Sequence, residues 1–205
     1  EYNGETYQTA EHWMMVRKAE LFNDLEKRAE ILSAETPGKA KAKGREVRGF
    51  NQRVWNEERM SIVINGNVLK FLKNKDLCQF LLNTQERILV EASPVDPIWG
   101  IGLAQDNPAT LNPYEWKGTN LLGFALMEVR RRLNQVEGVE ALTKVLPPPW
   151  LKYPELDPMD MGWKMGYGEE YILELSKYFE TLNEKEKYFY QLIYPAPKEW
   201  LNWYD

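Results

Sequence analysis

The stretch "TAEHWMMVRKAELFND", residues 9–24, decides the fold because its apolar residues recur at the spacing of a helix. At about 100° per residue, one arc of this helix carries apolar side chains together with Glu11 and Lys18. Thr9 precedes the run and can accept a hydrogen bond from the first turn. The sequence therefore predicts a helix from Thr9 to about Ala34 that places a carboxylate and an ammonium on its buried face.

Outward from this helix, the patterns predict an α+β fold that is predominantly α-helical with a small β-sheet. The expected elements are a tight turn at 3–4, a basic turn and one long helix over 39–74 broken near Gly66, a helix over 75–85, a strand over 87–93, a loop over 94–118 and a helix over 121–135. The loop is too long to serve only as a connection, so we expect it to be functional.

The composition shifts after Gly138, where the chain becomes rich in proline and aromatic residues. This shift predicts two domains, 1–136 and 137–205, the second a helical extension packed on the first. Four tryptophans, at 150, 163, 200 and 203, are the expected anchors of this extension. A surface for a protein partner is the alternative interpretation.

Charge and composition narrow the class of protein. The 205 residues hold no apolar run near the roughly 20 residues that span a membrane, and no secretory leader is recognisable. The sequence has a single cysteine, Cys78, which we expect to be a core residue. The absence of a cysteine pair predicts an intracellular, cytoplasmic protein. One cysteine and one histidine are too few for a structural zinc site. Residues 1–135 carry 19 basic and 18 acidic side chains, so this part is compatible with an anionic ligand.

Several stretches together resemble the NADAR (YbiA-like) family. They are "TAEHWMMVRKAELFND", "AKAKGREVRGFNQRVW", "KFLKNKDLCQFLLNT", "LVEASPVDPIWGIGL" and "WKGTNLLGFALMEVRRRL", and the resemblance covers about residues 7–133. The pattern D-x-x-W-G-I-G followed by W-x-G-x-N-x-L-G-x-x-L-M-x-x-R is specific. The resemblance implies a mostly helical fold with a small sheet, and a hydrolase that cleaves N-glycosidic bonds to a phosphorylated ribose.

Two substrate classes follow from the resemblance. One is ADP-ribose attached to guanine in nucleic acid or nucleotides, which implies reversal of ADP-ribosylation within NAD metabolism. The other is the ribosylamino-pyrimidine intermediates of riboflavin synthesis. Some family members, including those nearest the riboflavin branch, carry an aspartate at the position of Ile101. This difference favours ADP-ribosylguanosine as the substrate. Family members also have a further segment before the first helix, so we expect part of the pocket to be missing here.

The first helix supplies the predicted catalytic pair. Cleavage of an N-glycosidic bond passes through an oxocarbenium-like transition state. A carboxylate such as Glu11 can stabilise this state or act as the acid that protonates the leaving base. Burial lowers the pKa of a lysine, so Lys18 can act as a Schiff-base nucleophile. The alternative is that both charged side chains lie at the edge of the apolar face of the helix and extend into water.

The loop "VDPIWGIG", residues 95–102, supplies a third catalytic candidate, Asp96, and three candidates for substrate binding. Trp99 can stack on a base or a ribose, and Gly100 and Gly102 allow the backbone to approach a ligand closely. The structural alternatives are a turn capped by Asp96 and a tryptophan buried beneath an ordinary loop.

Four further residues are candidates for binding phosphate or base. Gly118 and Asn120 lie before a helix N-terminus, where free N–H groups attract anions, although simple capping explains them equally well. Arg45 belongs to a basic run that can hold a diphosphate or remain solvated, and Glu91 is a candidate to orient a base.

The function expected from these observations is removal of ADP-ribose from guanine. The expected partners are an ADP-ribose-containing substrate, including ADP-ribosylated DNA or RNA, with no membrane, no metal and no cofactor. A binding module for ADP-ribose or another NAD metabolite is the alternative of another class. Such a binder has little need of Glu11 and Lys18, so their presence favours an enzyme.

Overall fold

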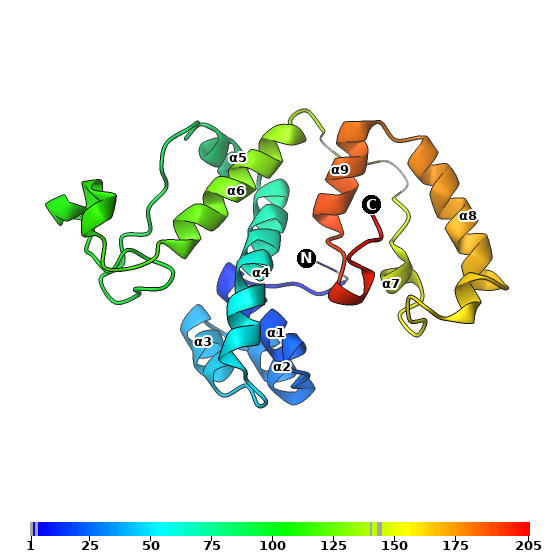
Figure 1. Ribbon diagram of the computed structural model, residues 1–205, viewed down its shortest axis with the longest axis horizontal. Helices are drawn as coiled ribbons and strands as arrows, with labels where there is room; N and C mark the ends of the chain where they lie inside the picture. The colour runs from blue at the N-terminus through cyan, green and yellow to red at the C-terminus, as the bar shows by residue number, and fades with distance from the viewer. Residues whose placement is uncertain (1, 3, 140, 143–144) are drawn as a thin grey trace. The chain divides into compact units, whose positions relative to one another are not determined.

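A computed structural model of the chain is mostly helical, with long loops and almost no strand in the residues that it describes (Figure 1). It describes residues 2, 4–139, 141–142 and 145–205. The chain divides into two compact units, Glu1–Leu133 and Asn134–Asp205.

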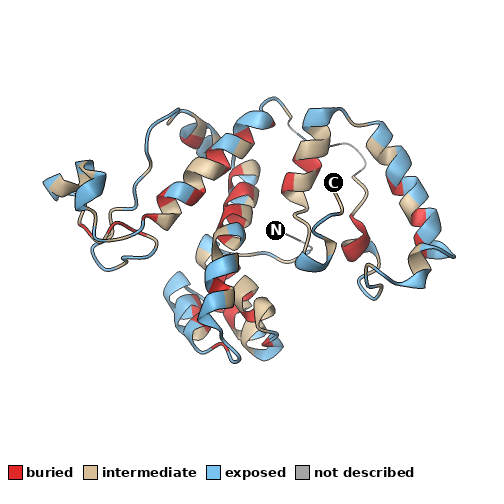
Figure 2. Ribbon diagram, in the orientation of Figure 1, coloured by how far each residue is buried: buried red, intermediate tan, exposed pale blue. Residues whose placement is uncertain are grey.

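The first unit contains six α-helices in the part of the chain that the structure describes, the last of which runs two residues past its end. They are α1 (Ala10–Leu21), α2 (Leu25–Leu32), α3 (Pro37–Arg45), α4 (Gln52–Lys73), α5 (Lys75–Leu82) and α6 (Leu121–Gln135), with two short 3-10 helices, η1 (Pro108–Leu111) and η2 (Pro113–Glu115), between α5 and α6. Helices α1, α2, α3 and α4 pack on one another, and the buried residues gather along α1 and α4 (Figure 2).

The prediction of one helix over 9–34 is wrong in its length. Thr9 caps the start of α1 as expected, because its side chain accepts a hydrogen bond from the N–H of His12. The helix then ends before Asn23, whose φ of 54° is left-handed. Asp24 begins α2 by accepting a hydrogen bond from the N–H of Lys27, so the apolar periodicity runs through a turn.

The segment that follows also differs from the prediction. Instead of a basic turn it forms α3, which Thr36 caps and which begins with Pro37, a favoured first residue of a helix. Helix α4 is continuous rather than broken at Gly66. A Cβ at Gly66 would overlap the indole of Trp13, so the glycine instead allows α1 to pack closely on α4.

The predicted strand over 87–93 is wrong, and the described residues form no β-sheet. A side chain of α6 and one from the residue just before it replace the partner strand. Arg130 donates to the carbonyl of Arg87 at 3.0 Å, and Asn120 donates to the carbonyl of Leu89 at 2.9 Å. The segment is therefore extended chain held on a helix.

An isolated antiparallel bridge joins Tyr2 and Glu5. Gly4, with a φ of 74°, lies between them at the predicted tight turn, whose other residue, at position 3, falls outside the described residues.

The only histidine of the sequence, His12, is a buried structural residue. Its side chain is 0% exposed, and its ring nitrogens lie 2.8 Å from the hydroxyl of Thr9 and 2.8 Å from the carbonyl oxygen of Ala34. These contacts join the start of α1 to the end of α2. Cys78, which was predicted to be a core residue, is half-buried in α5.

The second unit is held by aromatic rings. Its helices are α7 (Pro149–Lys152), α8 (Tyr167–Glu180) and α9 (Glu184–Ile193), with short 3-10 helices at Met161–Trp163 and Lys198–Trp200. The rings of Trp150 and Trp200 lie 5.6 Å apart, as do those of Trp200 and Trp203, and Trp163 also contacts Trp200. The four tryptophans thus belong to one cluster within this unit, and packing of the extension on residues 1–136 stays a prediction.

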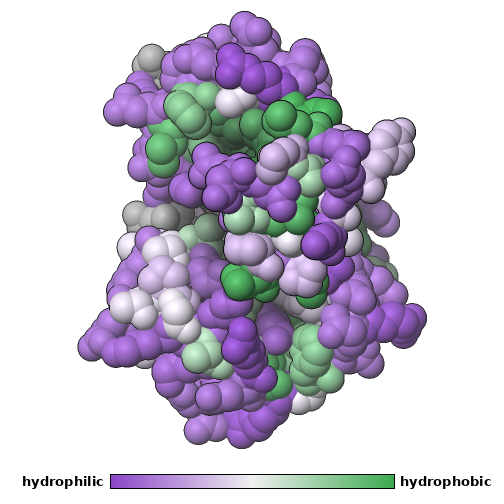
Figure 3. All heavy atoms as spheres, turned by 90° about the vertical axis from the view of Figure 1, so that its left-hand side faces the viewer, coloured by the Kyte–Doolittle hydropathy of each residue, from purple (hydrophilic) through white to green (hydrophobic). Residues whose placement is uncertain are grey.

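No helix in the described part of the chain is both long and apolar enough to cross a membrane. Exposed apolar side chains do occur, among them Phe80 and Ile88 in the first unit. Figure 3 shows apolar side chains gathered on the upper part of the face that it views.

Candidate active site

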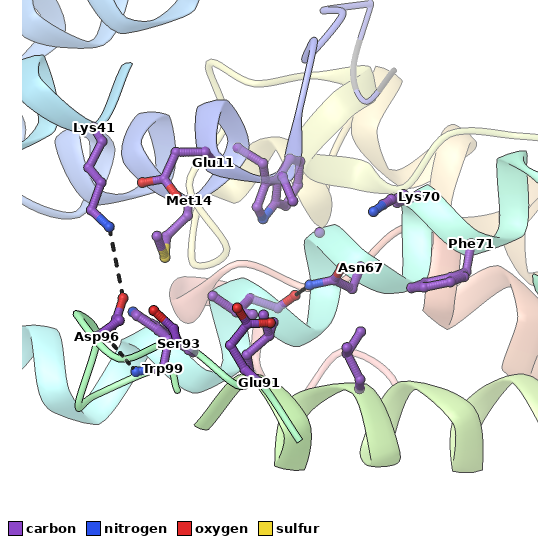
Figure 4. Close-up of a pocket in the computed structure, with 16 residues that line it drawn as sticks. Glu11, Met14, Lys41, Asn67, Lys70, Phe71, Glu91, Ser93, Asp96 and Trp99 are labelled. Atoms are coloured by element: carbon purple, nitrogen blue, oxygen red, sulfur yellow. Dashed lines mark hydrogen bonds and ion pairs between the residues drawn. The ribbon is translucent and has the colours of Figure 1, made fainter. Parts of the chain in front are cut away.

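A cavity of about 350 Å³ lies in the first unit, between α1, α3, α4, α6 and the loop before α6. Figure 4 shows Glu11 and Met14 reaching toward it from α1, across from Glu91, Ser93 and Asp96 of the loop. The lining residues are Ala10, Glu11, Trp13, Met14, Lys41, Val63, Gly66, Asn67, Lys70, Phe71, Glu91, Ser93, Asp96, Trp99, Leu122 and Leu126. The cavity therefore brings together four predicted site residues: Glu11, Glu91, Asp96 and Trp99.

Glu11 is the most unusual of these residues. Its Oε1 atom is buried and has no hydrogen-bond partner among the residues that the structure describes. Burial raises the pKa of this carboxyl and nearby Asp96 raises it further, while Lys41 and Arg45 act in the opposite direction. A buried polar atom without a partner costs free energy, so its retention indicates a function. A carboxyl group of raised pKa is suited to donate a proton near neutral pH.

Asp96 caps the turn, as the structural alternative for it predicts, and it also lies at the cavity. Its Oδ1 accepts hydrogen bonds from the N–H groups of Ile98 at 3.0 Å and Trp99 at 2.9 Å, which caps the turn. Its Oδ2 lies 3.9 Å from the ammonium of Lys41 on α3, at the edge of the cavity (Figure 4). The carboxylate thus links the loop to α3 across the cavity.

Asn120 holds the loop rather than facing the cavity. It is 0% exposed and left-handed, with a φ of 52°. Its side chain accepts a hydrogen bond from the N–H of Glu91 at 3.0 Å and donates to the carbonyl of Leu89 at 2.9 Å. The N–H of Asn120 also donates to Gly100. The geometry makes Asn120 the residue that positions Glu91, in place of the predicted contact with substrate.

The N-terminus of α6 offers little to an anion. The N–H groups of residues 119 to 122 donate in turn to the carbonyl oxygens of Pro97, Gly100, Ile98 and Trp99, at 2.9 to 3.3 Å. A phosphate bound by these four groups would have to displace the bonds, because each N–H already has a carbonyl partner. These hydrogen bonds weigh against the anion site at Gly118 and Asn120, which stays a prediction.

The predicted ligand-binding glycines are explained by close packing. A Cβ at Gly118 would overlap the carbonyl oxygen of Gly100, and a Cβ at Gly100 would lie 2.8 Å from the carbonyl oxygen of Glu91. Gly102 has a φ of 69°, a conformation that glycine adopts readily. None of Gly100, Gly102 and Gly118 lines the cavity.

Lys18 does not line the cavity that Glu11 lines. Its ammonium donates to the carbonyl of Gly44 at 2.7 Å and lies 4.2 Å from the ring centre of Phe50. Burial lowers the pKa of Lys18, which is the property expected of a Schiff-base lysine. The lowered pKa of Lys18 thus agrees with the prediction, whereas its position outside the cavity of Glu11 does not.

Two other predicted positions lie outside the cavity. Arg45 is exposed at the end of α3 and acts on Glu11 only through its charge. Ile101 is fully buried, so the difference between isoleucine and aspartate there lies in the core and does not alter the cavity lining directly.

Sequence reasoning missed several lining residues, chiefly Lys41, Asn67 and Lys70. Lys41 belongs to the basic run but was not singled out within it. Asn67 is buried on an otherwise apolar face of α4, a signal that was available in the sequence. Within the described ranges, no group of three or more His, Cys, Asp or Glu side chains is arranged to hold a metal ion.

Comparison with known proteins places these residues in a family. A family model described as the NADAR domain matches residues 1–134. N-glycosidase R617 of Acanthamoeba polyphaga mimivirus is 43% identical over 136 residues, which cover 65% of this chain and 80% of that protein. N-glycosidase Npun_R5314 of Nostoc punctiforme is 33% identical over 62% of this chain and 75% of its own length.

N-glycosidase YbiA of Escherichia coli is 30% identical over 131 residues, which cover 64% of this chain and 73% of that protein. The matched family region corresponds closely to the first unit, which holds the cavity. The second unit lies almost entirely beyond it. Because the family model covers more than half of the chain, this protein belongs to the NADAR family.

Proposed function

We propose that this protein hydrolyses an N-glycosidic bond, and that its substrate is ADP-ribose linked to guanine. The observation that carries the proposal is the buried, unpartnered Oε1 of Glu11 in a cavity that two further carboxylates, Glu91 and Asp96, also line. Relatives that share 30% to 43% identity with the chain are named N-glycosidases, which supports the reaction class.

Glu11 is the general acid of this proposal. Departure of the base requires a proton on its leaving nitrogen, and the raised pKa of Glu11 increases the protonated fraction of its carboxyl group. The remaining carboxylates then stabilise the positive charge that develops on the ribose. Acid and stabilising charge thus come from the two sides of one cavity.

The choice of guanine rests on hydrogen-bond chemistry. Guanine presents an N–H and an amino group side by side, and a carboxylate can accept from both. Glu91 and Asp96 supply such acceptors, while Trp99 supplies an indole on which a base can stack. ADP-ribosylated DNA or RNA would present the same base and is the proposed macromolecular form of the substrate.

Lys18 is the proposed nucleophile. Its neutral amine attacks C1′ of the ribose, the bond from C1′ to the base breaks, and the base leaves with the proton of Glu11. The ribose ring then opens to an imine, which water hydrolyses to regenerate the amine. The lowered pKa of Lys18 supports this role. Its ammonium must leave the carbonyl of Gly44 to reach the cavity.

The test is direct. The protein is incubated with ADP-ribosylated guanosine and, separately, with ribosylamino-pyrimidine phosphates, and products are identified by mass spectrometry. Release of guanosine or guanine with ADP-ribose supports the proposal. Turnover of the pyrimidines alone would transfer the function to riboflavin intermediates, and binding without turnover of either would identify a non-catalytic ADP-ribose module.

A further inference from the structure

A second cavity, of about 360 Å³, adjoins the active-site cavity within the first unit. The two share four lining residues: Ala10, Trp13, Gly66 and Lys70. Apart from these, the second cavity is lined by Tyr2, Tyr7, Gln8, Thr9, Leu69, Lys73, Asn74 and Leu77, which come from the N-terminal segment, α4 and α5. Neither the cavity nor these residues has a role in the reaction described above.

The wall between the two cavities is firmly positioned. The indole N–H of Trp13 donates to the carbonyl of Ile62 at 2.8 Å, and the ring packs against Gly66, where no side chain intervenes. Lys70 extends from α4 at this boundary, toward the cavity shown in Figure 4. A ligand that occupies both cavities would therefore pass beside Trp13 and Lys70.

The two cavities differ in charge. Three carboxylates, those of Glu11, Glu91 and Asp96, line the first cavity, and none is among the lining residues of the second. Each cavity is lined by two lysines, Lys41 and Lys70 in the first and Lys70 and Lys73 in the second, so the carboxylates make the difference. Because like charges repel, a phosphate is favoured in the second cavity and disfavoured beside the carboxylates.

Lys70 is better placed for a phosphate than the cations on α3. Its ammonium makes no ion pair with any residue that the structure describes, and its one recorded contact is with the ring of Phe71 at 5.5 Å. Lys41 is already 3.9 Å from Asp96, and Arg45 lines neither cavity. A phosphate bound at Lys70 thus need not compete with an existing carboxylate partner.

The second cavity also has an aromatic wall. Tyr7 contacts Trp13 with ring centres 5.0 Å apart, and its hydroxyl donates to Glu5 at 2.9 Å, which fixes the ring. Tyr2 contacts the same indole at 5.5 Å. The guanidinium of Arg17 already lies over the ring of Tyr2, 4.8 Å from its centre, so Tyr7 is the ring better suited to stack on a planar base.

From these observations we infer that the second cavity is a subsite for a nucleoside phosphate. Lys70 binds the phosphate at the boundary, and the base stacks on the tyrosine side of the cavity. This inference rests on the proposed function and deepens it. The subsite takes the adenosine diphosphate end of ADP-ribose while the distal ribose lies by Glu11. A substrate with one phosphoribosyl group would leave it empty.

The test fills the second cavity and leaves the first intact. Leu77 lines it from α5 and is 42% exposed, so Leu77→Trp adds bulk there without disturbing the core. Phe80→Trp on the same helix, at a side chain that lines neither cavity and is 73% exposed, is the matched control. Binding of ADP and of ribose 5-phosphate is measured by calorimetry on each full-length variant, and melting temperatures establish that both fold.

We expect ADP to bind the wild-type protein. Leu77→Trp should weaken ADP binding about tenfold or more, whereas the affinity of Phe80→Trp should stay within about twofold of the wild-type value. Ribose 5-phosphate can reach Lys70 from the first cavity, so it should bind the wild type, Leu77→Trp and Phe80→Trp with similar affinity. Lys70→Gln should weaken the binding of ADP about tenfold and change the affinity for adenosine little, because the substitution removes a charge-assisted contact to phosphate.

Two outcomes would overturn the inference: no ADP binding to the wild type, or equal ADP affinity in Leu77→Trp and Phe80→Trp. Neither would affect the proposed function, whose test is release of a base. The opposite result is also possible to recognise. If Leu77→Trp weakens ADP binding but the wild-type protein turns over neither substrate class, the subsite is established and the proposed reaction is refuted.

Discussion

The two ends of α1 place opposite charges on one helical face, and they differ in what meets them. At the N-terminal end, Glu11 enters a cavity and its Oε1 has no hydrogen-bond partner among the described residues. Two turns later, the ammonium of Lys18 is covered by the carbonyl of Gly44 and the ring of Phe50. Burial moves the pKa of each group toward its neutral form. One charge is thus left available, and the other is held.

The difference follows from how α3 approaches α1. At Gly44 the absence of a side chain lets the α3 backbone reach Met15, so a carbonyl oxygen comes within hydrogen-bond distance of Lys18. Near Glu11, α3 contributes only the side chain of Lys41 to the cavity. Burial alone therefore does not determine whether a charged group faces the cavity, and Lys18 must leave the carbonyl of Gly44 to reach it. The presence or absence of a partner distinguishes the two ends.

Replacing Lys18 tests the comparison most severely. Under the proposed covalent route, Lys18→Ala should abolish turnover while costing only about 1 kcal/mol of stability, the value of one hydrogen bond. Lys39→Ala, at an exposed lysine of α3, is the control. Mass spectrometry after borohydride reduction should find a ribose adduct on the Lys18 peptide. A variant that keeps its rate but melts at lower temperature would make Lys18 a structural support for Gly44.

Glu11→Gln removes the acid and keeps the shape of the side chain. Turnover should fall by about a thousandfold, within the range of general acid catalysis. In the wild type, the rate should fall as pH rises through the raised pKa of Glu11, and this limb of the profile should be absent in the variant. Glu26→Gln, at an exposed carboxylate of α2, is the control. Near-normal rates in Glu11→Gln would show that the unpartnered oxygen has no chemical role.

The loop opposite Glu11 is tested through Gly118. Its Cβ would overlap the backbone of residues 97 and 100, so Gly118→Ala should destabilise the protein by about 1–3 kcal/mol and reduce turnover. Gly38→Ala in α3 is the matched control, because open space surrounds that position. It should be neutral or stabilise by up to about 1 kcal/mol. Chemical denaturation of both variants measures the difference, and equal stabilities would contradict the packing role.

The smallest effect is expected at Lys41. Its charge lowers the pKa of Glu11, so Lys41→Met should raise that pKa. Because protonated Glu11 is the active form, the fall in rate with rising pH should move to higher pH. Lys39→Met, whose lysine pairs with Glu35, should leave the profile unchanged. A shift to lower pH in Lys41→Met would contradict Glu11 as the acid.

The elements that local patterns determine were predictable. Helical spacing and the cap at Thr9 gave the start of α1, and the same reasoning gave α5 and α6. The break at Asn23 was missed because Asp24 is held by Arg48, 24 residues away. The predicted strand failed because alternation of apolar residues over 87–93 does not reveal that Asn120 and Arg130, just before α6 and within it, replace a partner strand.

The site was predictable to the same extent. Motif resemblance singled out Glu11, Glu91, Asp96 and Trp99, which the structure brings to one cavity. It could not distinguish them from Asn120, which supports the loop. It also missed Lys70, whose significance depends on a cavity wall shared with Trp13, 57 positions earlier in the chain.

The sequence by itself determined that one helical face carries Glu11 and Lys18, because a period of 3.6 residues is a local property of the backbone. Only the tertiary structure decided that Glu11 faces a cavity and that Lys18 meets Gly44. The physical reason is that desolvation and hydrogen bonding depend on atoms brought together by packing. The partner of Lys18 lies 26 residues away in the chain, and no local pattern specifies it.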